Sequence, residues 1–381
     1  MSRVVLFSNS LRVGGSERNV ATYARCLPRY GYEPEVWVLH GGGEYESSLR
    51  AAGIPVRDLG RRRSYSPLFA LRAARAVAKS DAELFHVFHS AALSYAVLAK
   101  RLFGWRGRLC FYVGSSSHDW TRKDRCYRPL IRGECDAWSA NSPDSRDRFI
   151  AMGIERDRID IIPNGHDPTL YVPQDDSSAL REKLGIRTDD PVLFFCGRLI
   201  ASKGVPTLIQ ATQRLVADHP RLKFLIAGDG PQRESLSSLV ERLQLHDHVQ
   251  FLGARDDIPQ LLNMADAFVF ASETEGLPNS VIEASLARLP IVAADIPGTA
   301  AVVRDDMEGL LVPPGDVAGF AAAIARVLKD KNLRGRLSEA AYERAKNCFD
   351  VDASMRALCR FYDKALATDR SQLAPSDQLV A

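Results

Sequence analysis

Two carboxylates, Glu275 and Glu283, are separated by seven residues in the segment SETEGLPNSVIEASLARLP. The first follows the apolar run AFVFAS and is expected in a loop, and a helix beginning near Asn279 or Ser280 places the second in about its first turn. A carboxylate accepts two hydrogen bonds, which fits the vicinal hydroxyls of a sugar or ribose, and amides at a helix start can face a phosphate. A glutamate that only stabilises the helix dipole, beside an unrelated loop acid, is the alternative.

Two cations, Arg198 and Lys203, lie in the segment GRLIASKG, directly after the continuous apolar run PVLFFC. Such a run is typical of a buried parallel strand. Two cations on one strand-to-helix connection can clamp a diphosphate while nearby amides add hydrogen bonds. A solvated surface pair is the alternative, but the flanking glycines and the buried strand favour anion binding.

Two glycines, Gly14 and Gly15, follow the first apolar run and precede a stretch with helical periodicity. Glycines let the backbone approach a bound group closely, and the helix start offers N–H groups to a phosphate. A plain turn capped by Ser16 explains the pattern equally well. The segment is neither a P-loop nor a dinucleotide fingerprint. In AGDGP (residues 227–231) the third glycine of that fingerprint is replaced by Arg233, so a turn is the better interpretation.

Three histidines follow strand-like runs. His118, beside Asp119 in FYVGSSSHDW, is placed to touch a substrate, or else caps the next helix or is held by Asp119. His86 and His89 in LFHVFHS are weaker candidates for lining a cleft. No carboxylate or cysteine stands near them at metal-ligand spacing, so no metal role is expected. The seven cysteines are scattered and form no CxxC pair, which fits a reducing compartment.

The elements that must position these residues alternate along the whole chain, strand-like runs with helical stretches, which is typical of parallel α/β layering. The pattern restarts at PVLFFCGRL after a polar segment, so two doubly wound, Rossmann-like domains facing a central cleft are expected. A single α/β domain with appended helices is the alternative. The predicted divisions are 1–168, 169–350, a helix over 351–367 that packs back on the first domain, and a flexible tail over 368–381. The strand candidates are VVLF, EVWVL, PVRDL, LFHVF, LCFYV and IDIIP, then PVLFFCGRL, KFLIAG, HVQFLG, AFVFAS, PIVAA and GLLVP.

Taken together, the motifs resemble those of a family 4 glycosyltransferase, a retaining nucleotide-sugar enzyme of the GT-B fold. The resemblance runs from residue 1 to about residue 365. The segments that carry it, in order, are GGSER, HD at 118–119, IIPNGHD, GRLIASKG, LIAGDGP, FLG, SETEGLPNSVIEA and EGLLVPPGD. In IIPNGHD, His166 replaces the commoner apolar residue, and the HxH pattern near His86 is altered to HVFH, so His89 receives no role.

The resemblance implies a role for each matching residue. Glu283 would bind the ribose, Arg198 and Lys203 the diphosphate, and Gly15 a phosphate. His118 would lie near the anomeric carbon. Asn164 and Gly165 would form the hinge between domains. The remaining donor-binding positions are Gly197 and the loop that holds the donor sugar, which comprises Glu275, Gly276, Leu277, Pro278 and Asn279.

This assignment implies that the configuration at the anomeric carbon is retained. The acceptor hydroxyl would attack from the face that the diphosphate leaves, and a diphosphate oxygen would take the acceptor's proton. Neither a cofactor nor a metal is expected, because Arg198 and Lys203 stabilise the leaving group. The donor would be a UDP- or GDP-linked sugar, and the acceptor a saccharide or lipid-linked saccharide in polysaccharide, lipopolysaccharide or glycolipid assembly. A nucleotide-sugar epimerase or hydrolase on the same scaffold is one rival, and a non-catalytic nucleotide-sugar-binding protein is another.

The composition, with 46% hydrophobic and 25% charged residues, excludes a disordered or fibrous chain. The net charge of +3 hides an asymmetry, because residues 61–133 contain 15 Lys and Arg against four acids, a net of +11, which leaves −8 for the rest. No secretory leader or spanning helix is expected, so a cytoplasmic protein is predicted, peripheral on the inner face of the plasma membrane. A basic first domain fits an anionic membrane, a merely solvated face is the alternative, and nucleic acid is disfavoured for want of a recognisable module. The apolar residues set among the cations are Leu102, Phe103 and Trp105, beside Lys100, Arg101, Arg106 and Arg108.

Overall fold

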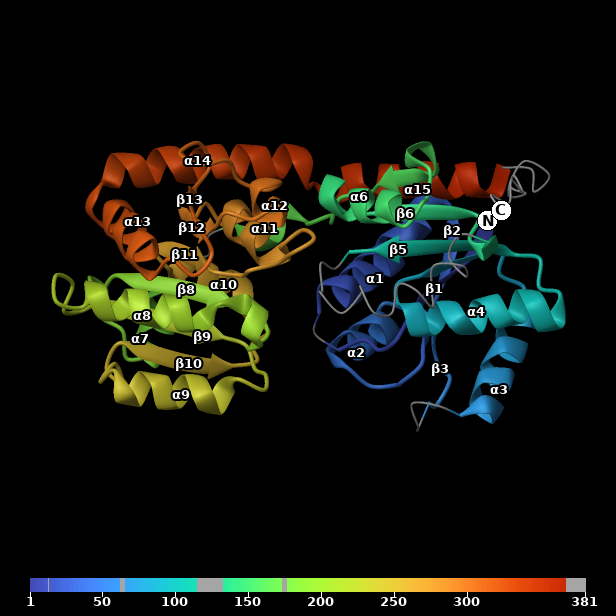
Figure 1. The fold of residues 1–381 in the computed structure, drawn as a ribbon, viewed down its shortest axis with the longest axis horizontal. Helices are drawn as coiled ribbons and strands as arrows, with labels where there is room; N and C mark the ends of the chain where they lie inside the picture. The colour runs from blue at the N-terminus through green and yellow to red at the C-terminus, as the bar shows by residue number, and fades with distance from the viewer. Residues whose placement is uncertain (13, 62–65, 115–132, 173–176, 368–381) are drawn as a thin grey trace, which may run out of the picture. The chain divides into compact units, whose positions relative to one another are not determined.

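The computed structural model describes residues 1–12, 14–61, 66–114, 133–172 and 177–367. It divides into two units of parallel α/β structure (Figure 1). The first comprises Met1–Gly165 and the returning segment that begins at Asp352, and the second comprises His166–Val351. His118, Asp119 and the predicted tail over 368–381 lie outside the described residues.

The first unit is built on a seven-stranded sheet in the order β3-β2-β1-β4-β5-β6-β7, in which every pairing is parallel. Parallel pairing requires a crossover between successive strands, and helices supply most of these crossovers. The strands are β1 (Ser2–Ser8), β2 (Tyr32–Val38), β3 (Val56–Asp58), β4 (Leu84–Val87), β5 (Arg108–Val113), β6 (Ala137–Ala140) and β7 (Ile159–Ile161). The helices are α1 (Gly15–Cys26), α2 (Glu44–Ala51), α3 (Pro67–Ala78), α4 (Ser90–Phe103) and α6 (Pro143–Ala151), with short 3-10 turns at Leu27–Tyr30 and Arg156–Arg158.

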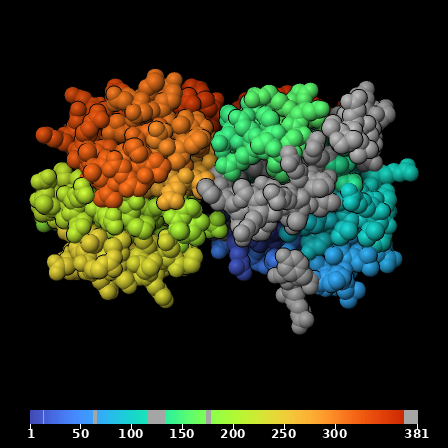
Figure 2. Space-filling model, in the orientation of Figure 1, coloured from blue at the N-terminus to red at the C-terminus, as the bar shows by residue number. Residues whose placement is uncertain are grey.

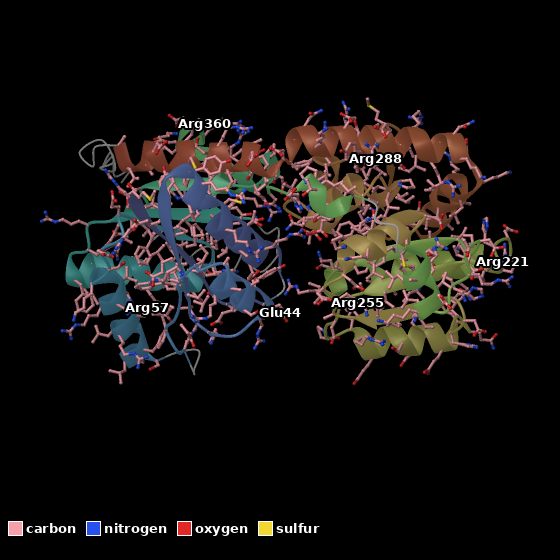
Figure 3. The ribbon with its side chains drawn as sticks, turned by 180° about the vertical axis from the view of Figure 1, so that it is seen from behind. Glu44, Arg57, Arg221, Arg255, Arg288 and Arg360 are labelled. Carbon is pink, nitrogen blue, oxygen red and sulfur yellow. The ribbon has the colours of Figure 1, made fainter. Side chains whose placement is uncertain are left out.

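The core of the first unit gathers large aromatic side chains from neighbouring strands. Phe7, Trp37 and Phe85 meet edge to face, with ring centroids 5.2–6.2 Å apart. Trp105 packs on Phe85 at 5.1 Å and is only 7% exposed, so the prediction that it forms part of a surface patch is wrong. On the outer side of Trp37 the guanidinium of Arg57 lies 4.4 Å from the ring centroid (Figure 3).

The second unit is built on a six-stranded parallel sheet in the order β10-β9-β8-β11-β12-β13. Its strands are β8 (Val192–Cys196), β9 (Lys223–Ala227), β10 (Val249–Gly253), β11 (Ala267–Phe270), β12 (Ile291–Ala294) and β13 (Leu310–Val312). Its helices are α7 (Ser177–Lys183), α8 (Val205–Leu215), α9 (Arg233–Arg242), α10 (Ile258–Met264), α11 (Asn279–Leu286), α12 (Pro297–Ala300), α13 (Val317–Lys329) and α14 (Lys331–Cys348), with 3-10 turns at Pro168–Tyr171 and Ala201–Lys203.

The strand order of the second sheet reverses between β8 and β11. Because parallel crossovers are right-handed, the helices before and after this reversal cover opposite faces of the sheet. Accordingly α8 packs with α9, whereas α10 packs with α7 and α11 with α14. Helix α13 follows the last strand, β13, and returns to pack on α8. Figure 2 shows α9 (yellow) and α13 (orange) at the surface of this unit. Ligands of such sheets bind beyond the strand carboxyl ends at the reversal, so the loops after β8 and β11 are the positions of interest.

The last helix, α15 (Val351–Ala367), packs on the first unit. Tyr362 on its buried face has its hydroxyl 2.9 Å from His86 Nδ1, and Ser354 donates a 2.6 Å hydrogen bond to the Pro163 carbonyl. Asp363 accepts a hydrogen bond from the Tyr32 hydroxyl. These buried contacts make the chain return part of the first unit's core. Within the part of the chain that the structure describes, no helix combines the length and apolarity needed to cross a bilayer.

Candidate functional site

The loop after β8 carries the first predicted anion-binding group. Gly197 continues directly from the strand, and the side chain of Arg198 is exposed beyond it. Among the described residues, the Arg198 guanidinium has no ion-pair partner. An exposed, uncompensated guanidinium at the carboxyl end of a central strand retains its full charge toward an incoming phosphate.

The loops after β8 and β11 are joined by an ion pair between Lys203 and Glu275. Their side chains are 19% and 16% exposed, and the Ser272 hydroxyl lies 2.8 Å from Glu275 Oε1. The Lys203 ammonium also lies 5.4 Å from the centroid of the Phe270 ring. The sequence assigned these two charges to different parts of a donor, and the structure places them in contact. Each therefore sets the electrostatic environment of the other.

Helix α11 begins at Asn279, and its N-cap residue, Pro278, makes no side-chain cap hydrogen bond. The first turn of a helix carries backbone N–H groups from which an anion can accept hydrogen bonds. Glu283 lies in the second turn, one turn later than expected, and is 5% exposed. The three residues before α11, which are Gly276, Leu277 and Pro278, are buried. The two glutamates thus differ in setting, one in an ion pair between loops and the other buried on a helix.

The glycine-rich segment 227–231, interpreted from the sequence as a plain turn, supports the loop that carries Arg198. Gly228 has φ +133°, and a Cβ there would fall 1.9 Å from the Gly197 carbonyl oxygen. The close approach lets Gly197 donate a 3.0 Å hydrogen bond to Ala227 O and Leu199 a 2.9 Å bond to Asp229 O. Any side chain at position 228 would push the two loops apart. The segment therefore positions the candidate site without binding a dinucleotide.

Gly298 is a second supporting residue, and the sequence analysis missed it. It lies in the short helix α12, where a Cβ would fall 2.5 Å from the carbonyl oxygen of Glu275. The backbone of Glu275 therefore packs closely against α12. The signal available in the sequence was a glycine shortly after the strand run PIVAA, which alone fits an ordinary turn.

In the first unit a polar cluster lies at the carboxyl ends of β1 and β4, where that sheet reverses. His89 Nδ1 is 3.2 Å from the Ser8 hydroxyl and accepts from the Asn9 backbone N–H at 3.4 Å. Its Nε2 lies 3.3 Å from a carboxylate oxygen of Glu17 in the first turn of α1. Acceptance at Nδ1 leaves the ring hydrogen on Nε2, directed to Glu17. Gly15, the predicted phosphate contact, is the exposed first residue of the same helix.

His86, by contrast, is a core residue. Its Nδ1 lies 2.9 Å from the Tyr362 hydroxyl and its Nε2 3.0 Å from that of Ser139. The side chain is fully buried, and burial lowers the pKa of His86 to about 3. A neutral, enclosed imidazole of this kind does not line a ligand site, so the suggestion from the sequence that His86 lines a cleft is wrong.

Two sequence predictions remain, one for His118 and one for a metal site. His118, the predicted residue near the anomeric carbon, lies outside the described residues. Within the described ranges, no three His, Cys, Asp or Glu side chains gather closely enough to hold a metal ion.

Two doubly wound parallel sheets give this chain the GT-B fold, which solved glycosyltransferase structures share. The chain belongs to family 4 of these enzymes. Residues 13–170 match the family described as "Glycosyltransferase Family 4", and residues 176–344 match "Glycosyl transferases group 1". The two matches fall on the first and second units respectively.

The chain is 34% identical over 218 residues to the lipopolysaccharide core biosynthesis glycosyltransferase LpsE of Rhizobium meliloti strain 1021, an alignment covering 57% of this chain and 61% of that protein. It is 32% identical over 180 residues to an Escherichia coli enzyme named UDP-Gal:alpha-D-GlcNAc-diphosphoundecaprenol alpha-1,3-galactosyltransferase, covering 46% of each. The alignments thus span less than two thirds of either relative. Among solved structures, HepE of Anabaena in complex with UDP-glucose superimposes with a TM-score of 0.86 at 25% identity, over 96% of this chain and 100% of that one.

Proposed function

We propose that the protein transfers a hexose from a nucleoside-diphosphate sugar to a hydroxyl acceptor, with retention at the anomeric carbon and without a metal. The observation that carries this proposal is the cluster at the reversal of the second sheet. There the exposed Arg198, the Lys203–Glu275 pair and the start of α11 all follow β8 or β11. The UDP-glucose bound to HepE and the UDP-galactose in the name of the Escherichia coli relative support such a donor.

In the proposed reaction, the bond from the anomeric carbon to the diphosphate oxygen breaks as the acceptor oxygen forms its bond on the same face. The departing phosphate oxygen takes the acceptor's proton, so both charge and atoms balance. Arg198 and Lys203 stabilise the negative charge that grows on this phosphate, since preorganised cations act without reorganising during the reaction. An ammonium group has three donors, so Lys203 can hold a phosphate oxygen while keeping its contact with Glu275.

The two glutamates serve different parts of the donor in this proposal. Glu275 accepts hydrogen bonds from the sugar hydroxyls, and backbone amide N–H groups of the loop from Gly276 to Asn279 donate to the sugar. Glu283, buried on α11, accepts from the ribose hydroxyls. Gly15 remains a prediction for a phosphate contact, and His118 remains a prediction for the region of the anomeric carbon.

The proposed acceptor is a saccharide or a lipid-linked saccharide of polysaccharide, lipopolysaccharide or glycolipid assembly. The names of the two relatives, one acting in lipopolysaccharide core biosynthesis and one on a diphosphoundecaprenol-linked sugar, support this class. An acceptor of this kind places the enzyme on the cytoplasmic face of the plasma membrane.

Helix α3 supplies a surface that fits this location. Leu68 and Leu71 are 77% and 49% exposed, and the cations on the same exposed face are Arg72, Arg75 and Lys79. Exposed leucines beside cations match an anionic bilayer, where each Lys or Arg contributes about 1 kcal/mol near the surface. Figure 2 shows α3 (light blue) at the surface of the first unit. The patch predicted at the end of α4 is less suitable, because Lys100 and Arg108 both pair with Asp136 and Arg101 pairs with Glu134.

The membrane proposal is tested with vesicles that contain phosphatidylglycerol, compared with neutral phosphatidylcholine vesicles. Binding to the anionic vesicles should fall as salt is added, and the double variant Leu68→Ser with Leu71→Ser should weaken it. Equal binding to both kinds of vesicle, or none to either, would remove the proposal.

The catalytic proposal is tested by incubating the purified protein with UDP-, GDP- and ADP-sugars, with and without a saccharide acceptor. A transferase consumes one donor faster when the acceptor is present and forms a product of retained configuration. Turnover of donor alone at an equal rate would instead identify an epimerase or hydrolase on this scaffold.

A further inference from the structure

His166 makes a direct side-chain contact with the candidate donor loop. Its Nε2 lies 3.1 Å from Oδ1 of Asn279, the first residue of α11. The histidine is 3% exposed, so this hydrogen bond is shielded from water at the imidazole side. Both residues belong to the second unit. Position 166 was noted in the sequence only for its departure from an apolar residue, and the contact with Asn279 was not foreseen.

The backbone of His166 is itself fixed on both sides. Its N–H donates a 2.8 Å hydrogen bond to Phe349 O, and its carbonyl accepts a 3.0 Å bond from Val351 N–H. The imidazole packs against the ring of Tyr171, with centroids 6.4 Å apart. A side chain held by two backbone hydrogen bonds and a ring contact keeps its orientation before any ligand arrives, which is what a supporting residue requires.

The contact determines which way the Asn279 amide is turned. A carbonyl oxygen only accepts, so His166 Nε2 must carry the hydrogen, and the amide N–H groups of Asn279 are directed away from the imidazole. They are attached at the start of α11, where backbone N–H groups and the helix dipole favour an anion. Two residues beyond the end of α11, Arg288 (labelled in Figure 3) pairs with Glu339 on α14, and its guanidinium lies 3.7 Å from the ring centroid of Tyr342.

We propose that His166 is a positioning residue of the donor site, which holds the Asn279 amide so that its N–H groups donate to the terminal phosphate of a nucleoside diphosphate. The inference rests on the proposed function. It adds a residue that acts through Asn279 and need not touch the donor itself. A phenylalanine at position 166 would keep a ring in the buried space and lose the donor, whereas a glutamine would keep an N–H at a similar reach.

The test uses isothermal titration of the full-length protein with UDP, GDP, UMP and GMP. For the diphosphate that the wild type binds, His166→Phe should weaken binding ~5-fold and Asn279→Ala ~10-fold, as for losing a hydrogen bond to a charged group. The double variant should also stay near ~10-fold, because the histidine acts through the asparagine. His166→Gln should remain within about twofold of the wild type, and affinity for the matching monophosphate should change little in every variant.

A matched control is His248, which lies just before the amino end of β10 in the same sheet. Its Nδ1 is 2.9 Å from the Leu222 carbonyl oxygen. His248→Phe should leave diphosphate affinity unchanged. Should His166→Phe fail to fold, Asn279→Ala tests the same contact from the helix side. The quantity to compare is then the ratio of its affinity for UDP to that for UMP, or for GDP to that for GMP.

Three results would overturn the inference: multiplied losses of ~50-fold in the double variant, equal losses for mono- and diphosphate, or wild-type affinity in His166→Phe. Each of them leaves the proposed function standing, because the wild type still binds a diphosphate. If the wild type binds no nucleotide at all, the proposed function and this inference fall together.

Discussion

Replacing Glu275 by glutamine should change donor binding and turnover in opposite directions. The carboxylate is in contact with the Lys203 ammonium, and both side chains are mostly buried at 16% and 19% exposure. Glutamine keeps the shape and an oxygen that can accept from Ser272, but it removes the negative charge. Lys203 then faces an incoming phosphate without a neighbouring carboxylate, while the sugar hydroxyls lose a charged acceptor.

The magnitude follows from Coulomb's law. A phosphate in contact with Lys203 lies ~6 Å from the carboxylate, and at an effective dielectric constant of ~40 the repulsion between unit charges is about 1.4 kcal/mol. Removing that repulsion should tighten UDP or GDP binding ~10-fold. Turnover of the sugar donor should fall ~10²-fold, the lower end of the range for losing one preorganised catalytic hydrogen-bonding group.

Calorimetric titration measures the diphosphate Kd, and initial rates with the active donor measure kcat. Glu273→Gln is the matched control, because Glu273 is an exposed acid in the same loop and its backbone N–H donates a hydrogen bond to the Ser202 carbonyl. It should change neither quantity by more than about twofold, as expected for a screened surface charge. Weaker diphosphate binding in Glu275→Gln, or unchanged kcat, would refute the electrostatic reasoning.

Further substitutions test the other parts of the account. Arg198→Ala should lower kcat/KM by roughly 10²–10³ in steady-state assays, and a loss of tenfold or less would remove its role at the leaving group. Glu283→Gln should chiefly raise the donor KM, so an unchanged KM would count against ribose binding. Gly298→Val should displace the backbone of Glu275 and lower kcat by at least ~10-fold, with little change expected in thermal stability if only this loop moves. His86 is neutral when folded but protonates near pH 6.5 when unfolded, so stability is full above that pH and falls below it, by about 1.7 kcal/mol between pH 6.5 and 5. Denaturant titrations should show this slope in the wild type and lose it in His86→Gln.

The second sheet was predictable because its central strands, β9, β8, β11 and β12, are almost wholly buried. All six appear in the sequence as apolar runs of strand length, and each run is a strand in the structure. In the first sheet, β6 (Ala137–Ala140) was missed. Its sequence, AWSA, is short and lacks β-branched residues, and the strand forms because its position between β5 and β7 buries Trp138. Tertiary context, which sequence periodicity does not contain, decided that element.

The candidate site divides in the same way. The sequence predicted which loops carry the charges, because Arg198, Lys203 and Glu275 follow apolar runs of strand length. The pairing of Lys203 with Glu275 did not follow, because it depends on the distance between loops 70 residues apart in sequence. The prediction that Trp105 is exposed was wrong for a related reason. An aromatic residue among cations suggests an exposed patch until the partners of those cations are known. Asp136, which pairs with two of them, lies about 30 residues later.

The most direct test of the central claim is a thermal-shift titration of the wild type and Arg198→Ala with UDP-, GDP- and ADP-sugars. A ligand that binds only the folded state at 100 times its Kd stabilises it by about 2.7 kcal/mol, which raises Tm measurably. The account predicts that the sugars of one nucleotide raise the wild-type Tm, and that Arg198→Ala loses most of this shift. No shift with any donor, or an equal shift in both proteins, would contradict a nucleotide-sugar site at the reversal of the second sheet.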